Sequence, residues 1–133
     1  MRSAVVEVET GHRRFTDLTA EVVAFCRGGG DGLVSVFVPH ATAGVTLMEL
    51  GLGSEEDLSA LLDRLVPRDG RYRHRHGSPG HGADHLVPVL VGSSVTVPVV
   101  SGEPQLGTWQ SVVLVDTNED NHHRTVQLTF LGA

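Results

Sequence analysis

The chain has 133 residues, of which 40% are hydrophobic and 20% are charged, and its formal net charge is −6. Length and composition fit a single folded domain, which we expect to span residues 1–133. The acidic balance argues against binding to nucleic acid or to an anionic membrane surface. No apolar run approaches the roughly 20 residues that cross a bilayer. All ten basic residues are Arg, which excludes a Schiff-base lysine and a P-loop.

The chain has one cysteine, Cys26, and therefore no internal disulfide. Its N-terminal residues alternate Val and Glu and lack the apolar segment of a signal peptide. A cysteine-poor chain of this kind fits a reducing compartment. We therefore expect a cytoplasmic protein.

Hydrophobic periodicity and turn residues predict the elements in chain order. The predicted elements are a strand at 4–9, a helix between residues 16 and 28, strands at 33–38 and 42–49, a helix from residue 54 to the proline at 67, a loop over 67–82, a short helix at about 83–91, and strands at 94–100, 108–116 and 123–130. The short connections between the last strands favour antiparallel pairing. We therefore predict an α+β fold with a mainly antiparallel sheet or sandwich and two or three helices.

Histidines are concentrated in the predicted loop. Four of the eight lie between His74 and His85, and His40 directly follows a predicted strand. Imidazole is the commonest zinc ligand and titrates near neutral pH. Three imidazoles with one open position would suit a catalytic metal. No HExxH or CxxC pattern supports this, so exposed loop histidines without a specific role are the alternative.

Two acidic residues and one hydroxyl follow or begin predicted strands. Glu49 could act as a general base beside a metal, and Asp116 could orient a histidine. Thr42 could bond a phosphate or a histidine. Each is equally compatible with an ordinary strand-end residue.

The predicted loop is also rich in arginine. Guanidinium groups suit bidentate binding of phosphate or carboxylate, which makes a small anionic molecule a sensible ligand. The arginines are Arg68, Arg71, Arg73 and Arg75. A solvated charge run is the alternative.

A glycine precedes the chain's only tryptophan, Trp109. This side chain could stack on an aromatic ligand, or it could anchor a strand in the core.

Several segments together resemble the YjbQ family, whose members are described as secondary thiamine-phosphate synthases. These segments are Pro39-His40-Ala41-Thr42-Ala43, Glu49, Tyr72-Arg73-His74, His85-Leu86, Pro98-Val99 with Gly102, and Gly107-Thr108-Trp109-Gln110. The resemblance extends from about residue 4 to residue 131. It implies a small α+β fold of two packed sheets, a homotrimer, and a pocket near a subunit interface.

The resemblance also implies roles for residues of the pocket. By position, His40, His74 and His85 would bind a divalent metal, for which zinc is the expected ion. Glu49 and Asp116 would be the catalytic carboxylates. The substrate would contact Thr42, Arg73, Gly107, Thr108, Trp109 and Gln110. The expected partner is a small phosphorylated anionic metabolite.

This chain departs from the family pattern around those residues. The family usually has Asn on both sides of the acidic residue, where this chain has Met48 and Leu50. An acidic pair before the last histidine is replaced by Gly80 and His81, and a threonine by Ala41. The three histidines are intact, so the metal site is better supported than the catalysis.

The resemblance implies a weak ability to join hydroxymethylpyrimidine diphosphate to thiazole phosphate with release of pyrophosphate. One alternative is a non-catalytic trimeric protein that binds a metal or an anionic metabolite. Another is a structural trimer whose loop histidines only sense pH. His76 and His81 are expected to be loop residues without a role in the site. The alternative for His81 is that it takes the place of the lost carboxylate as a ligand.

Overall fold

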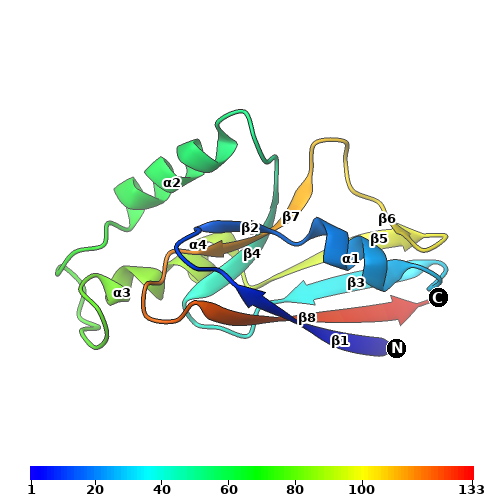
Figure 1. Ribbon diagram of the computed structural model, residues 1–133, viewed down its shortest axis with the longest axis horizontal. Coiled ribbons are helices and arrows are strands. Elements are labelled where there is room, and N and C mark those ends of the chain that lie inside the picture. The colour runs from blue at the N-terminus through cyan, green and yellow to red at the C-terminus, as the bar shows by residue number, and fades with distance from the viewer.

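The computed structural model describes residues 1–133 and contains two antiparallel sheets with four helical segments (Figure 1). One sheet has the strand order β1-β8-β3-β5-β6, and the other has the order β2-β7-β4. The strands are β1 (Arg2–Glu9), β2 (Phe15–Asp17), β3 (Gly32–Phe37), β4 (Ala43–Met48), β5 (Ser94–Val100), β6 (Glu103–Pro104), β7 (Ser111–Asp116) and β8 (His123–Gly132). The helices are α1 (Thr19–Cys26), α2 (Ser54–Leu65), α3 (His81–Asp84) and α4 (Val87–Val91). The predicted α+β fold with a two-sheet antiparallel arrangement is confirmed.

The structure differs from the predicted elements in three places. The short strands β2 and β6 were not predicted, because two or three residues show no periodicity. The helix predicted at 83–91 is two short helices, and Pro88 lies in the first turn of α4, where a missing N–H costs nothing. Residues 108–110 form a turn that is closed by a hydrogen bond from the Gln110 N–H to the Gly107 carbonyl.

The strand β7 lies between two hydrophobic cores. Successive side chains of a strand point to opposite faces, so Val112 and Leu114 enter the core between the two sheets. Val113 and Val115 face the other way and pack with residues of α2, α3 and α4, including Leu62. Both faces of β7 are therefore buried, which explains its unbroken apolar sequence.

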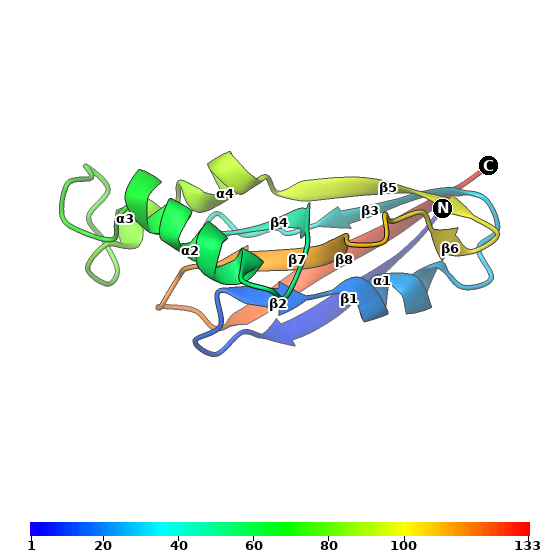
Figure 2. The same cartoon turned by 90° about the horizontal axis from the view of Figure 1, so that it is seen from above.

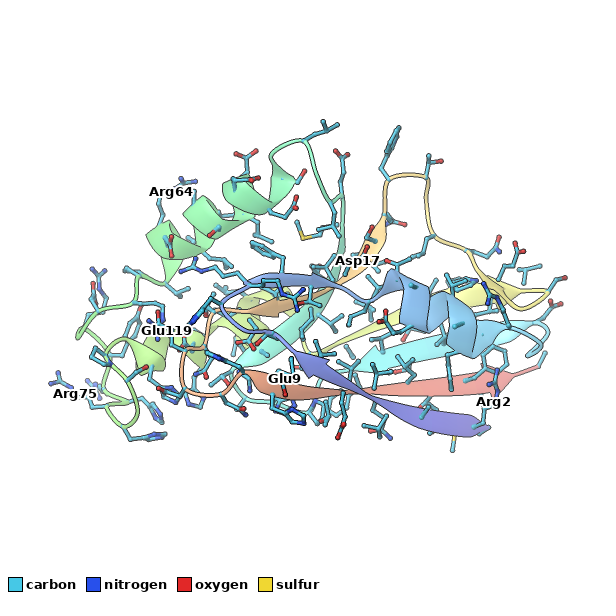
Figure 3. All side chains as sticks on the ribbon, viewed as in Figure 1. Arg2, Glu9, Asp17, Arg64, Arg75 and Glu119 are labelled. Atoms are coloured by element: carbon cyan, nitrogen blue, oxygen red, sulfur yellow. The ribbon has the colours of Figure 1, made fainter.

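The molecule is elongated, and its two ends differ. Both termini lie at one end, together with α1 and β6, whereas the histidine-rich loop and α3 lie at the opposite end (Figures 1 and 2). Arg2 and Arg75 mark these two ends in Figure 3. None of the helices has the length and apolar character needed to cross a membrane.

Strand β4 and helix α4 approach so closely that a side chain is excluded at Gly44. A Cβ built at this residue would lie 2.4 Å from the Gly92 carbonyl oxygen and 3.3 Å from the Pro88 Cα. The Val45 N–H donates to the same Gly92 carbonyl at 3.0 Å, which holds the two segments together. Glycine at this position thus brings α4, and the loop before it, against the edge of the smaller sheet.

We expect Gly44→Ala to lower the free energy of unfolding by about 1–3 kcal/mol, because the added methyl group meets backbone atoms that cannot rotate away. Gly70→Ala is the matched control, because a Cβ there meets nothing within 4 Å. It should change stability by less than about 0.5 kcal/mol. Urea unfolding of both variants measures the difference, and equal stabilities would contradict this account of the β4–α4 contact.

Candidate functional site

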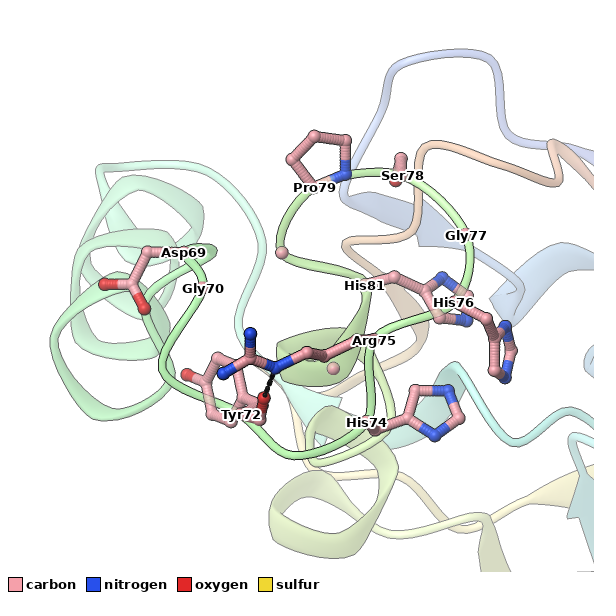
Figure 4. A pocket seen from close by; sticks show the side chains of 12 residues that line it. Asp69, Gly70, Tyr72, His74, Arg75, His76, Gly77, Ser78, Pro79 and His81 are labelled. Carbon is pink, nitrogen blue, oxygen red and sulfur yellow. Dashed lines mark hydrogen bonds between the residues drawn. The ribbon is translucent and has the colours of Figure 1, made fainter.

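The four histidines of the loop and α3 converge. One ring nitrogen from each of His74, His76, His81 and His85 lies within 4.8 Å of the others. The rings of His74 and His85 have centroids 4.3 Å apart, so the structure brings these two predicted ligands together. In Figure 4 the rings of His74, His76 and His81 extend to the same side of the loop, whereas Arg75 extends to the other. Four convergent imidazoles are a donor set that suits zinc and similar ions.

The loop is held in place by the buried carboxylate of Asp84. Arg68 donates to its two oxygens, from Nε at 2.9 Å and from Nη2 at 3.0 Å. The Thr117 hydroxyl donates at 2.8 Å and the Asn118 side-chain amide at 3.2 Å. Arg68 begins the loop, Asp84 ends α3, and Thr117 and Asn118 follow β7, so one carboxylate joins three segments.

The loop also folds back on itself at Gly82. A Cβ at this residue would lie 2.7 Å from the Tyr72 Cβ and 2.9 Å from the His74 carbonyl oxygen. The Tyr72 hydroxyl donates to the Pro67 carbonyl at 2.7 Å. These contacts place the chain carrying His74 directly beside α3, which carries His81.

A carboxylate fixes the orientation of the His81 ring. The Asp120 carboxylate lies 2.8 Å from His81 Nδ1 and also accepts the Ser78 N–H at 3.1 Å. A carboxylate only accepts hydrogen bonds, so Nδ1 carries the proton and Nε2 offers its lone pair to the cluster. The Asn118 side-chain nitrogen lies 3.1 Å from the same His81 nitrogen and donates one of its two hydrogens to Asp84. A carboxylate behind a histidine is the usual support of a metal-binding imidazole.

The two Nε2 atoms of His81 and His85 lie 3.0 Å apart. At this distance one ring can donate an N–H to the lone pair of the other, and a metal ion that replaced this hydrogen would be bound by both rings. The pKa of His85 is lowered by burial first and then by the charges of His81 and His76, while Asp84 and a hydrogen bond with the Ala41 backbone oppose the shift. The pKa of His74 is also lowered, with desolvation the main cause. Neutral rings with available lone pairs are the form that binds metals.

His40 does not join the four-histidine group. Its Nε2 accepts the main-chain N–H of Thr125 at 3.0 Å, and the Thr125 hydroxyl lies 3.3 Å away. Burial and the positive charge of Arg124 lower the pKa of His40. The ring lines a separate cavity together with His85. The structure thus places this predicted ligand beside the cluster, with Nε2 already engaged.

Neither of the two predicted carboxylates belongs to the four-histidine group. Asp116 is buried and forms an ion pair with the buried Arg124, whose Nε donates at 2.7 Å. Arg124 also donates to the Thr42 hydroxyl at 2.8 Å, so Thr42 bonds a protein group. Glu49 follows β4, is half-buried, and belongs to no group of metal-ligating side chains.

The segment from residue 107 to residue 110 projects from the protein as an exposed turn. The side-chain oxygen of Gln110 accepts the Gly107 N–H at 2.9 Å. Trp109 is 71% exposed and lines none of the cavities, so it is not a core tryptophan. The connection between β6 and β7 that contains this segment lies away from α3 and the histidine-rich loop (Figure 1).

Most of the loop arginines are engaged by neighbouring groups. Arg68 pairs with Asp84 and Glu119, and Arg71 pairs with Asp69. Arg75 donates to the Tyr72 carbonyl at 3.1 Å and lines a cavity of about 270 Å³ beside the histidines. Arg73 is exposed and makes no side-chain hydrogen bond or ion pair, which leaves it available to an anion.

Sequence reasoning missed part of this site. His76 and His81 were expected to be decoration, with His81 as a replacement ligand only in the alternative, yet both converge with the other rings. The support from Asp120 and Asn118 was not foreseen, since they lie in a turn about 40 residues further along. The only sequence signal was the density of histidines itself.

We expect Asp116→Ala to lower the free energy of unfolding by about 3–5 kcal/mol, because it leaves the buried guanidinium of Arg124 without a counter-charge. Asp63→Ala is the control, since Asp63 pairs with Arg14 at an exposed site and should cost about 1 kcal/mol or less. Denaturant titration distinguishes the two. A small effect of Asp116→Ala, similar to that of the control, would show that the buried pair does not stabilise the fold.

Comparison with known proteins places the chain in one family. Residues 4–133 match the model of the UPF0047 protein YjbQ-like family. A UPF0047 protein of Mycobacterium tuberculosis is 61% identical over 131 residues, which is 98% of each chain. A crystal structure of a hypothetical protein from Aeropyrum pernix K1 superposes with a TM-score of 0.91 at 32% identity over 100% of both chains. A conserved hypothetical protein of Thermus thermophilus gives a TM-score of 0.83 at 33% identity, over 96% of this chain and 99% of that one. The chain therefore belongs to the YjbQ-like UPF0047 family.

Proposed function

We propose that this protein is a metal-binding enzyme of the YjbQ type, in which the loop and α3 hold a divalent ion, zinc. The observation that carries the proposal is the convergence of four imidazole nitrogens within 4.8 Å. Two features of the surroundings support it: the Asp120 carboxylate behind His81 and the lowered pKa of His85. A ring held in this way is ready to bind an ion without reorganisation.

The reaction that we propose joins hydroxymethylpyrimidine diphosphate and thiazole phosphate. The thiazole ring nitrogen attacks the methylene carbon of the pyrimidine, a C–N bond forms, and the C–O bond to the diphosphate breaks. Pyrophosphate leaves with the electron pair. A bound ion would supply positive charge beside this leaving group. The unengaged guanidinium of Arg73, on the same loop as His74, would bind the phosphate oxygens.

A non-catalytic binding protein for a metal or an anionic metabolite is the second candidate. It is favoured by the positions of the two predicted carboxylates. Asp116 is committed to the ion pair with Arg124, and Glu49 lies outside the histidine group. Neither is placed to move a proton at an ion held by the four rings, so binding without turnover also fits this geometry.

We further propose that the protein is a cytoplasmic homotrimer, as the family resemblance implies. The outer face of the larger sheet supports self-association, because it is exposed and partly apolar. Leu33 pairs across the strands with Leu131, and these side chains are 44% and 55% exposed. Phe37 and Val5 flank Gln127 further along the same face. Light scattering that gave the mass of a single chain would contradict a trimer.

Protein purified without a histidine tag should contain about one zinc ion per chain. His81→Ala should remove one ligand ring together with its contact to Asp120. Asp120→Asn should weaken zinc affinity about 10–100-fold, because the His81 ring loses its orienting carboxylate. His12→Ala is the control, since His12 packs against His122 outside the cluster. Elemental analysis and competition with a chelator measure both quantities. Absence of stoichiometric zinc in the wild type, or unchanged affinity in His81→Ala, would refute the metal site.

The enzyme and the binding protein predict different outcomes with the two substrates. If the protein is an enzyme, the zinc-loaded wild type forms thiamine phosphate slowly, and His74→Ala combined with His85→Ala abolishes the product. If it is a binding protein, no product forms, yet pyrophosphate raises the melting temperature of the zinc-loaded protein by mass action. Chromatography of the reaction mixture separates the two functions, and a thermal melt shows whether a protein without turnover binds the anion.

A further inference from the structure

We propose that His40 is a hydrogen-bond donor to substrate rather than a metal ligand, and that it serves a second cavity that receives the pyrimidine ring. This inference rests on the proposed function for the identity of the ring. It assigns the two sides of His85 to different parts of one substrate. The ion and the diphosphate would lie on the side of the four histidines, and the heterocycle would lie on the side of His40.

The hydrogen bonding of His40 determines which of its nitrogens is free. The Thr125 main-chain N–H can only donate, so the His40 Nε2 that it contacts at 3.0 Å must be the unprotonated nitrogen. Thr125 is held in register inside β8, paired with Glu7 of β1, so this donor cannot turn away without breaking the ladder. The Nε2 lone pair is therefore occupied, and the neutral ring carries its proton on Nδ1. Such a ring can donate to a ligand but has no free lone pair for an ion.

The cavity beside His40 has the composition expected for an uncharged ring. Its volume is about 310 Å³, and its lining is His40, Ala41, His85, Pro88, Val89 and Ser93. Pro88, Val89 and Ala41 supply apolar surface, and the lining contains no carboxylate and no arginine. Val89 is 76% exposed, so this side of α4 is free to cover a ligand. The cavity is shallow and open to solvent, and it combines an apolar wall with a few polar groups, as small-molecule sites do.

The lining selects a chemical class of ligand. A flat heterocycle with an acceptor nitrogen satisfies the His40 donor and packs its faces on the apolar side chains. The aminopyrimidine half of the proposed substrate has both properties. Because His85 borders this cavity and also contributes to the histidine cluster, a short substituent on the ring would reach from one side to the other.

Two measurements on His40→Ala test the inference. Zinc affinity should stay within about threefold of the wild type, in contrast to His81→Ala. Affinity of the zinc-loaded protein for the uncharged probe 4-amino-5-hydroxymethyl-2-methylpyrimidine should fall about tenfold, as expected for one lost hydrogen bond, while affinity for pyrophosphate is unchanged. His40→Asn keeps an amide N–H near the Nδ1 position and should retain most of the probe affinity. His12→Ala is the unaffected control, and calorimetry gives all of these affinities.

The outcomes separate this inference from the proposed function. A loss of zinc in His40→Ala as large as in His81→Ala would overturn it, because His40 would then be a ligand. Absence of probe binding to the wild type, or equal probe affinity in wild type and His40→Ala, would overturn the pyrimidine subsite. A wild type that binds no zinc, yet binds the probe through His40, would refute the metal site and leave the subsite standing.

Discussion

The candidate site depends on one buried charge, the carboxylate of Asp84. Burying an isolated carboxylate is very costly, and here the cost is offset by the Arg68 guanidinium and by two neutral donors, Thr117 and Asn118. The same interactions join the start of the histidine-rich loop, the end of α3 and the turn after β7. Contacts of Gly82 with Tyr72, and of Asp120 with His81, bring the same segments together around this carboxylate. The carboxylate also lies 4.0 Å from His81 Nδ1, so the charge that joins these segments stands directly behind the converging imidazoles.

The acidic residues at the end of β7 divide into two roles. Asp116 points into the protein and neutralises Arg124, which in turn holds Thr42 at the start of β4. Asp120, four residues later and partly exposed, supports His81 from behind. At the family position that suggested a catalytic carboxylate, Asp116 is thus engaged in a buried ion pair. The carboxylate that holds the His81 ring, Asp120, comes instead from the turn after β7. Nothing in its sequence position indicates that it contacts a histidine.

Local signals in the sequence predicted most of the elements, whereas the family resemblance singled out two of the converging histidines, His74 and His85. The Leu repeat and the proline at residue 67 define α2, and the apolar run before Asp116 defines β7. The path of the loop depends instead on contacts between distant residues, such as Asp84 with Arg68 and Gly82 against Tyr72. Such contacts leave no periodic pattern, so the participation of His76 and His81 could not be derived. The position of His40 outside the cluster was hidden for the same reason, since it depends on a main-chain donor from β8.

The burial of β7 on both faces has a consequence for how this protein can change over evolutionary time. The strand supplies side chains to both cores and continues directly into the turn that carries Asn118 and Asp120. A substitution in β7 therefore alters packing and the support of the loop together, and selection cannot adjust one without the other.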